Sequence, residues 1–564
     1  MNERRYARSY TSPGDRARAR RRRHGGGLYH RFNAEPHPDK SVTETRTALT
    51  VEPELAPTVA TFRAPPRRRA QKISHVLAAD LRRQILSGEL AADQQLPSEA
   101  ELTATFKISR ETLRETLRIL ESQSLLEIRR GRGGGAVVRR PGLAAVGRYV
   151  TLLLQLRKAT LAHLEEARLV IEPPAAEQLA VRCGQEGLDH LAALHENARA
   201  AADDPLSFAT AVATFDQAVT DLSGNRSIAV IAGVLRDIYT SQVYAAVGTS
   251  DLTSAERIAR RVIDSQSEFL QAARRREGDL ANRTWSEYLS STSRLLVSRS
   301  RSRQPIDVVQ LWRAQVSHTR NGQPQRMATS VAAEIRSRIA EGRLENGDRL
   351  SSLTDLAREF GISRPTLREA LRILETERLI ELRTGDRGGA QIQHPSTQIA
   401  AQLAGTVLEA RQATLGDFYR AMRMIEPAMM RLVASRIDPA SLNDLRALVK
   451  ELSASTDDMP HFAETWGRGG VVAFAATHNP ALAIVAEILQ WVRVGNQPII
   501  TAAADDPWVA TATRNAQLFA ELVSALVAGD SSGAQNIWAS CLDVNAPFIE
   551  SSELGRRLMT NVID

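Results

Sequence analysis

The sequence predicts a mainly helical protein that consists of two copies of one unit. Aromatic residues make up only 5% of the 564 residues, while alanine, leucine and arginine are abundant, and this mixture favours helices over sheets. At an offset of 254 residues, the segments 108–121 (ISRETLRETLRILE) and 362–375 (ISRPTLREALRILE) agree at 12 of 14 positions without a gap. A chain of this length exceeds what one hydrophobic core can hold, so we expect several compact domains.

The same offset aligns further pairs, including Gly88 with Gly342 and Asn225 with Asn479. A polar stretch rich in turn residues separates the copies. We therefore divide the chain into a basic tail (1–70), a first small domain (71–141) and helical domain (142–300), a linker (301–325), and a second small domain (326–394) and helical domain (395–564).

The first small domain begins with two predicted helices. Apolar residues recur at helical spacing over 73–87, and Gly88 is a typical C-terminal stop. Ser98 and Glu101 form a capping-box pattern, in which the serine accepts from a backbone N–H and the glutamate bonds back to the serine N–H. A second helix is expected from there to about Phe106.

A third helix and two short strands complete this domain. Ser109 is placed to cap the helix, in which Leu113, Leu117 and Leu120 form the apolar stripe. Strand-like runs at 126–130 and 136–140 enclose the glycine-rich segment 131–135. Three helices followed by a hairpin predict a winged helix-turn-helix.

Arg110, Arg114 and Arg118 recur every four residues on another face of the third helix. On most helices such a row is a solvated surface. In a helix-turn-helix, however, the start of this helix enters the major groove, where arginine can bond guanine O6 and N7 together. We therefore expect DNA binding.

These motifs resemble those of the GntR superfamily of regulators, and the helical remainder is similar to the FadR-type branch. The resemblance implies DNA contacts by Ser109, Arg110, Glu111, Arg114, Arg130 and Gly131, and in copy two by Ser363, Arg364, Pro365, Arg368, Thr384 and Gly385. The family commonly has an arginine where this chain has Ala100. In copy two, residues 350–356 (LSSLTDL) depart further from the family pattern, because they lack its proline and its first glutamate. Ser352 can still cap the helix, and Asp355 can partly replace the acid of the capping box.

The helical domains resemble the FCD type, an antiparallel bundle that in many members holds a divalent metal through one Asp and three His. The positions expected for histidine read Asp216, about Gln266 and Tyr288 in copy one, and Gly470, Phe519 and Cys541 in copy two. Without these nitrogen donors we expect no metal and no cofactor. Arg168 matches an arginine common in these domains; it either meets an anionic effector or forms an ion pair on the helix surface.

The charge distribution suggests a role for the tail. Residues 1–70 hold 16 Arg or Lys and 7 Asp or Glu, a net charge of +9. A flexible arm of this kind can hold nucleic acid phosphates without reading sequence; the alternative is an extension without a role. The chain has only two cysteines, Cys183 and Cys541, which lie far apart and exclude a disulfide framework. No apolar run reaches the length of a membrane span. We therefore expect a cytoplasmic, nucleoid-associated protein.

The leading functional prediction is a sequence-specific transcriptional regulator, more often a repressor than an activator, controlled by an organic acid or acyl-CoA. The alternative is a constitutive or architectural DNA-binding protein whose effector sites have decayed. An enzyme is not expected, because no cofactor loop or catalytic constellation is visible. Two heads on one chain predict an internal pseudo-dimer or a homodimer that binds an imperfect palindromic operator.

Overall fold

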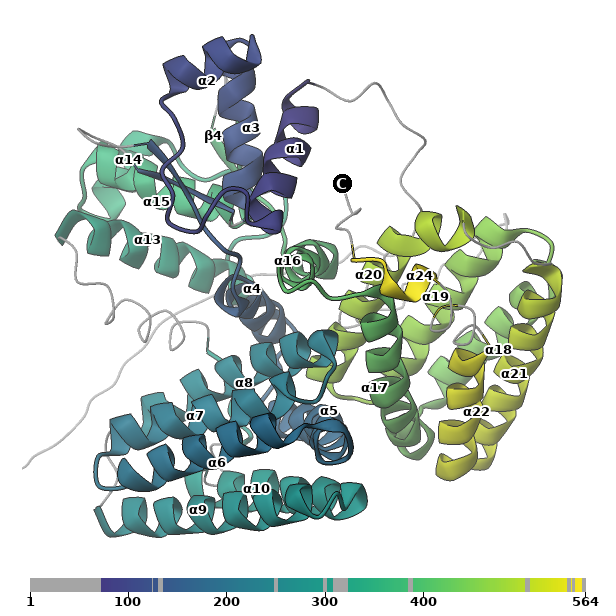
Figure 1. Ribbon diagram of the computed structural model, residues 1–564. Helices are drawn as coiled ribbons and strands as arrows, with labels where there is room; N and C mark the ends of the chain where they lie inside the picture. Colours follow the sequence, from purple (N-terminus) through teal and green to yellow (C-terminus); the bar gives the residue numbers. More distant parts are fainter. Residues whose placement is uncertain are drawn as a thin grey trace, which may run out of the picture. The chain divides into compact units, whose positions relative to one another are not determined.

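In a computed structural model of the chain, helices dominate both copies and the strands are confined to two hairpins (Figure 1). The structure describes residues 73–123, 125–129, 135–247, 252–297, 302–307, 323–383, 389–502, 508–544, 549 and 553–559. The basic tail and the tips of both wings lie outside these residues.

The first head consists of α1 (Ile73–Ser87), α2 (Glu99–Phe106), α3 (Arg110–Ser122), β1 (Leu126–Arg129) and β2 (Gly135–Val138). The predicted capping box is present, since Ser98 accepts from the Glu101 N–H and the Glu101 carboxylate accepts from the Ser98 N–H. Antiparallel pairing sets Leu126 against Val138. Leu113, Leu117 and Leu120 are buried under α1 and the hairpin, as their spacing predicts.

The second head repeats this arrangement with α13 (Gln323–Ala340), α14 (Leu353–Glu359), α15 (Arg364–Thr376), β3 (Ile380–Arg383) and β4 (Gly389–Ile392). Ser352 caps α14 and its hydroxyl donates to the Asp355 carboxylate at 2.6 Å. Both heads are therefore winged helix-turn-helix domains, and the expected fold class is confirmed.

The first helical bundle comprises α4 (Leu143–Leu156), α5 (Leu161–Arg182), α6 (Gln185–Ala200), α7 (Pro205–Asp221), α8 (Arg226–Val247), α9 (Leu252–Arg274) and α10 (Gly278–Leu296). Helices α9 and α10 pack antiparallel, and α10 lies along α5 (Figure 1). A separate apolar core fills the region between α5, α6, α7, α9 and α10.

The second bundle comprises α16 (Thr397–Ala410), α17 (Leu415–Arg436), α18 (Pro439–Ala454), α19 (Met459–Ala475), α20 (Pro480–Ala502), α21 (Trp508–Ala528), α22 (Ser531–Asp543) and the short α24 (Glu553–Arg556).

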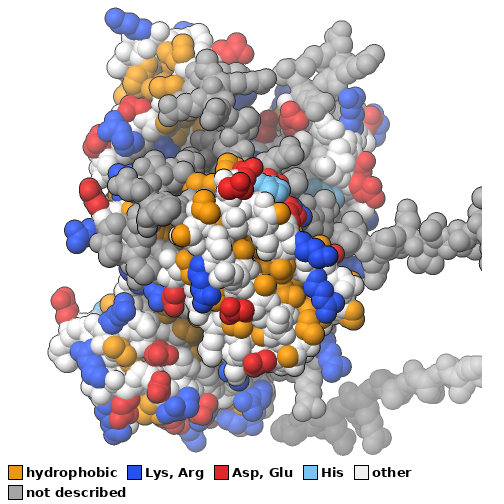
Figure 2. Space-filling view, turned by 90° about the vertical axis from the view of Figure 1, so that its right-hand side faces the viewer, with side chains coloured by type: hydrophobic (Ala, Val, Ile, Leu, Met, Phe, Trp, Pro, Cys, Tyr) orange, Lys and Arg blue, Asp and Glu red, His pale blue; other side chains and the backbone are white. Residues whose placement is uncertain are grey.

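On the face of the molecule in Figure 2, acidic and basic side chains are interspersed among scattered hydrophobic ones. No described helix has the length and apolar character needed to cross a membrane.

The two copies contact each other through corresponding helices. Helix α4 packs on α16 and α5 on α17, while α5 packs on α20 as α17 packs on α8. Buried residues of α4 and α8 belong to the same apolar core as the second bundle and second head. The heads also cross over, because α1 contacts α16 and α13 contacts α4.

Candidate DNA-binding heads and bundle centres

Each recognition helix begins with a serine that closes its first turn. Ser109 Oγ accepts from the Thr112 N–H at 3.1 Å, and Ser363 Oγ accepts from the Thr366 N–H at 3.3 Å. Each serine hydroxyl also lies 2.8 Å from the threonine hydroxyl. Both serines are exposed, so a cap and a contact with a DNA backbone are compatible roles for them.

The predicted DNA-contacting residues that follow Ser109 are exposed at the start of α3. Arg110 and Glu111 are solvent-accessible, and Arg114 forms an ion pair with Glu99 at 3.3 Å between Nε and Oε2. The Arg114 side chain is 63% exposed. A salt bridge this exposed is weak and is readily exchanged for a phosphate or a base.

The second head presents Arg364, Pro365 and Arg368 at the matching positions, all exposed. Arg364 Nη2 donates to the Thr354 hydroxyl at 2.9 Å. Leu353 stands where the first head has Glu99, so the acid that pairs with Arg114 is missing beside Arg368. The predicted wing contacts Arg130, Gly131, Thr384 and Gly385 lie outside the described residues.

The third arginine of the α3 row, Arg118, lies at the groove between the two heads. In the matching position of α15, Arg372 forms an ion pair with Glu121 of the first head at 3.1 Å. Burial raises the pKa of Glu375 in the second head, and the charges of Arg118 and Arg372 oppose this shift. We call these four residues the head clamp: Arg118, Glu121, Arg372 and Glu375.

The head clamp was not predicted from the sequence, although its four residues lie in the repeated segment at the same offset. A groove of about 990 Å³ between the heads is lined by Arg114 and Arg368 as well as by the clamp. The second arginine of each recognition helix therefore lies at this shared groove.

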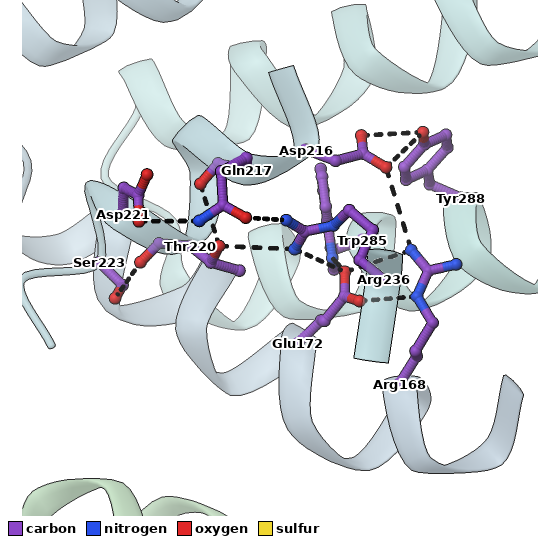
Figure 3. Close-up of polar contacts among 10 residues, drawn as sticks. All are labelled: Arg168, Glu172, Asp216, Gln217, Thr220, Asp221, Ser223, Arg236, Trp285 and Tyr288. Atoms are coloured by element: carbon purple, nitrogen blue, oxygen red, sulfur yellow. Dashed lines mark hydrogen bonds and ion pairs between the residues drawn. The ribbon is translucent and has the colours of Figure 1, made fainter. Parts of the chain in front are cut away.

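A network of buried charges fills the centre of the first bundle (Figure 3). Arg168 Nε donates to Glu172 at 2.7 Å, and Arg236 lies 3.5 Å from the same carboxylate. The Tyr288 hydroxyl donates to Asp216 at 2.9 Å. Two of the three positions at which the family commonly has histidine, Asp216 and Tyr288, are thus in direct contact. The third, Gln266, accepts through Oε1 from His195 Nδ1 at 3.2 Å.

The carboxylates of this network titrate differently. Burial raises the pKa of Asp216 to about 6, and Arg236 and Arg168 oppose the shift. Burial also disfavours the ionised form of Glu172, but Arg168 and Arg236 outweigh it and lower the pKa of that group. Glu172 is therefore a permanent counter-ion for both arginines at neutral pH.

The expected surface ion pair of Arg168 is wrong in its location. Arg168 pairs with a carboxylate one turn away, as the spacing allows, but its side chain is only 9% exposed and the partner is fully buried. The guanidinium lies 4.7 Å from the ring centre of Tyr239. Trp285 helps to enclose the pair, because its buried indole Nε1 donates to Glu172 at 3.4 Å.

Aromatic side chains fill the centre of the second bundle instead. Trp466 stacks on Trp538 with ring centres 5.6 Å apart. A Cβ on Gly469 would lie 2.7 Å from the Phe519 ring, so glycine is needed for this close approach. Glu426, which corresponds to Glu172, accepts from Trp538 Nε1 at 2.9 Å.

Two family models match both copies. The model described as "Bacterial regulatory proteins, gntR family" matches residues 73–135 and 327–388, and the model described as "FCD domain" matches residues 163–291 and 417–544. The chain belongs to the GntR family. It carries two GntR-type heads and two FCD domains in tandem.

Among curated proteins, GntR-family relatives include the HTH-type transcriptional repressor NanR of Cronobacter sakazakii, 27% identical over 227 residues, which are 39% of this chain and 84% of the relative. NanR of Citrobacter rodentium is 25% identical over 226 residues, 40% of this chain and 85% of the relative. Solved structures include Streptococcus agalactiae GntR, with a TM-score of 0.31, 22% identity and coverage of 39% of this chain and 99% of that one.

The FCD domains of this chain depart from the metal-binding pattern in two different ways. Copy one replaces histidines with a carboxylate, an amide and a phenol held in a charged network, and copy two replaces them with glycine, phenylalanine and cysteine. Among the described residues, no three His, Cys, Asp or Glu side chains gather as a metal site would require. Cys183 and Cys541 are free and buried.

Proposed function

We propose that this GntR-family regulator is a repressor that binds one operator through both of its heads. The observation that carries the proposal is the matched pair of exposed recognition-helix starts, each with two arginines, on heads joined by the head clamp. Arg110 and Arg114 would read bases in one half-site, and Arg364 and Arg368 in the other. Ser109 and Ser363 would contact phosphates.

Reciprocal packing supports an internal pseudo-dimer. In a two-fold dimer, each contact between different elements occurs twice. The packing of α5 on α20 and of α17 on α8 has this property, as does the packing of α4 on α20 and α16 on α8. One chain would then replace the two subunits of an ordinary family dimer.

The two heads would read unlike half-sites. Glu111 can accept from a cytosine amino group, whereas Pro365 offers only an apolar surface at the same place. The wing pair Arg130 and Thr384, and the helix-two pair Glu99 and Leu353, also differ. An imperfect palindrome is the operator that fits this asymmetry, and binding to it would place the protein at the nucleoid.

The curated relatives named as repressors favour repression over activation, and the family models match regulators rather than enzymes. Control by a small organic acid or acyl-type effector remains the leading proposal for the FCD domains. The filled bundle centres favour a second candidate, a constitutive DNA-binding protein with decayed effector sites. Thermal shift against organic acids and acyl-CoAs separates the two, because a bound effector must raise apparent stability.

Genome-wide mapping of bound DNA tests the function itself. The proposal expects a small set of sites that share a bipartite motif with two different halves. Even coverage of the genome without a shared motif would contradict sequence-specific repression and support an architectural role.

A further inference from the structure

A cavity of about 610 Å³ lies where the two heads meet the connecting helices α4 and α16. Residues of both heads, of α4 and of α16 line this cavity, which we call the junction cavity. Small-molecule sites in proteins commonly have volumes of about 300–1,000 Å³. We propose that the junction cavity binds one small amphiphilic anion.

The charge of the lining selects for an anion. The lining contains six arginine and four glutamate side chains, an excess of two positive charges. Some of these arginines have full counter-ions, since Arg336 pairs with Glu377 at 2.6 Å. Arg378, by contrast, donates to the neutral amide of Gln402 at 2.8 Å.

Arg148 of α4 lines the cavity from the bundle side. Burial lowers its pKa, the charge of Glu377 opposes this shift, and the neighbouring Arg336 adds to it. Two guanidinium groups, those of Arg148 and Arg336, therefore lie near the carboxylate of Glu377, which accepts from Arg336 at 2.6 and 2.7 Å. A carboxylate or phosphate placed beside Arg148 would stabilise its charge in a poorly hydrated site.

The remainder of the lining is apolar and would hold a short hydrocarbon tail. Leu126 and Ile128 come from the first head, Ile373 from the second, Leu152 from α4 and Leu403 from α16. Burial of a hydrocarbon tail against these groups is expected to strengthen binding about fourfold per CH₂. The ligand class is therefore a medium-chain carboxylate or alkyl phosphate.

A smaller cavity of about 180 Å³ in the first bundle is the competing location. It is lined by Arg168, Tyr239 and Arg294, but Arg168 is already bonded to Glu172. Its volume is below the usual range for small-molecule sites. The junction cavity is the better match in both size and apolar surface.

Calorimetric titration of the full chain with octanoate and octyl phosphate tests the proposal without DNA. One molecule per chain is expected to bind, while acetate, which has no tail, and octylammonium, which has the opposite charge, should bind at least about tenfold more weakly. Equal binding of octylammonium would overturn the assignment of an anion site.

Two variants locate the site by different means. Arg148→Gln removes the charge and Leu403→Trp fills the volume, and each should weaken octanoate at least about tenfold. Arg294→Gln in the smaller cavity is the matched control and should leave binding unchanged. The proposal would be overturned if only Arg294→Gln lost octanoate binding, or if both junction variants still bound octanoate like the wild type.

The site joins both heads, so a ligand there would also change operator affinity, a consequence that rests on the proposed function. Binding measured without DNA separates the junction site from its effect on the operator. If octanoate binds at the junction but the affinity for mapped operators does not change, the effector role is contradicted and the junction site stands.

Discussion

Glu172 and Glu426 occupy the same position in the two copies but have opposite electrostatic surroundings. Glu172 faces Arg168 and Arg236, whereas the matching positions in copy two are Met422 and Gln490. Without close cationic partners, burial raises the pKa of Glu426 to about 7, against the opposing effects of its bond from Trp538 and the charge of Arg493. One residue thus contributes differently to the stability of each bundle.

We predict that Glu426→Gln stabilises the second bundle increasingly as pH rises. The folded state holds the Glu426 proton up to about pH 7, whereas the unfolded chain releases it near 4.5, so wild-type stability falls as pH rises between these values. The penalty above pH 7 is on the order of 3 kcal/mol. Thermal unfolding midpoints from pH 5 to 8 should diverge, and a constant difference between the proteins would contradict the prediction.

Glu172→Gln is the matched variant and should have the opposite effect. The lowered pKa of Glu172 means that its stabilising contribution is present above its unfolded pKa and is lost as pH falls through the folded value. Breaking this buried pair is expected to cost about 3–5 kcal/mol at neutral pH. Thermal unfolding at pH 7 that matches the wild type would show that the network is not stabilising.

At the recognition helices, we predict that Arg110→Ala weakens operator binding more than binding to random DNA. Arg110 lies exposed at the first position of α3, where side chains reach base edges, and a lost bidentate contact costs about 1–3 kcal/mol. Gel-shift titration against both DNAs measures the ratio. Arg275→Ala, an exposed arginine of the first bundle, is the control. An equal loss for both DNAs would assign Arg110 to phosphate contact only.

Much of the residue-level structure of the heads is predictable because it is local. The Ser98 and Glu101 box, the Ser109 cap and the Leu113 stripe depend on residues three or four positions apart. Burial of Arg168 was not predictable, since its enclosure depends on Arg236 and Asp216, which lie on α8 and α7. Long-range neighbours decide whether a charged residue on a helix is exposed.

At the scale of elements, the head clamp fixes how the two recognition helices lie. Arg372 and Glu121 are 251 positions apart, and both side chains are about four-fifths buried. Partly buried pairs of this kind contribute more than exposed ones. The clamp would therefore set the distance between half-sites.

Exchange of the clamp charges tests this interpretation. Glu121→Arg should lower affinity for the mapped operator about fivefold by placing like charges together, and the added Arg372→Glu should restore most of it. Gel-shift measurements on operators with altered half-site spacing give the readout. A double variant no better than the single one would mean that the pair does not position the heads.

The heads are anchored to the bundles by different bonds. Arg82 of the first head bonds with Glu409 and Thr406 of α16, whereas the matching Arg336 bonds with Glu377 of its own head. The repeat predicts that Arg82 and Arg336 occupy equivalent positions, but it does not predict that they bond with different partners. Gln123 in copy one and Glu377 in copy two account for the difference, because only the acid offers a local counter-ion.

At the scale of the whole molecule, the repeat predicts the fold class and the order of domains, because each copy contains a complete set of local signals. The crossing of each head to the other copy's connecting helix could not be predicted, since α1 and α16 are more than 300 positions apart. The shared core of α4, α8 and the second bundle is likewise a product of tertiary packing.

The central claim is that one chain does the work of a dimer. Light scattering of the protein on its mapped operator, combined with footprinting, tests it most directly. We expect one chain per operator and protection of two unequal half-sites, one of which is lost in Arg110→Ala and the other in Arg364→Ala. Two chains that protect a symmetric site, sensitive only to Arg110→Ala, would contradict the account.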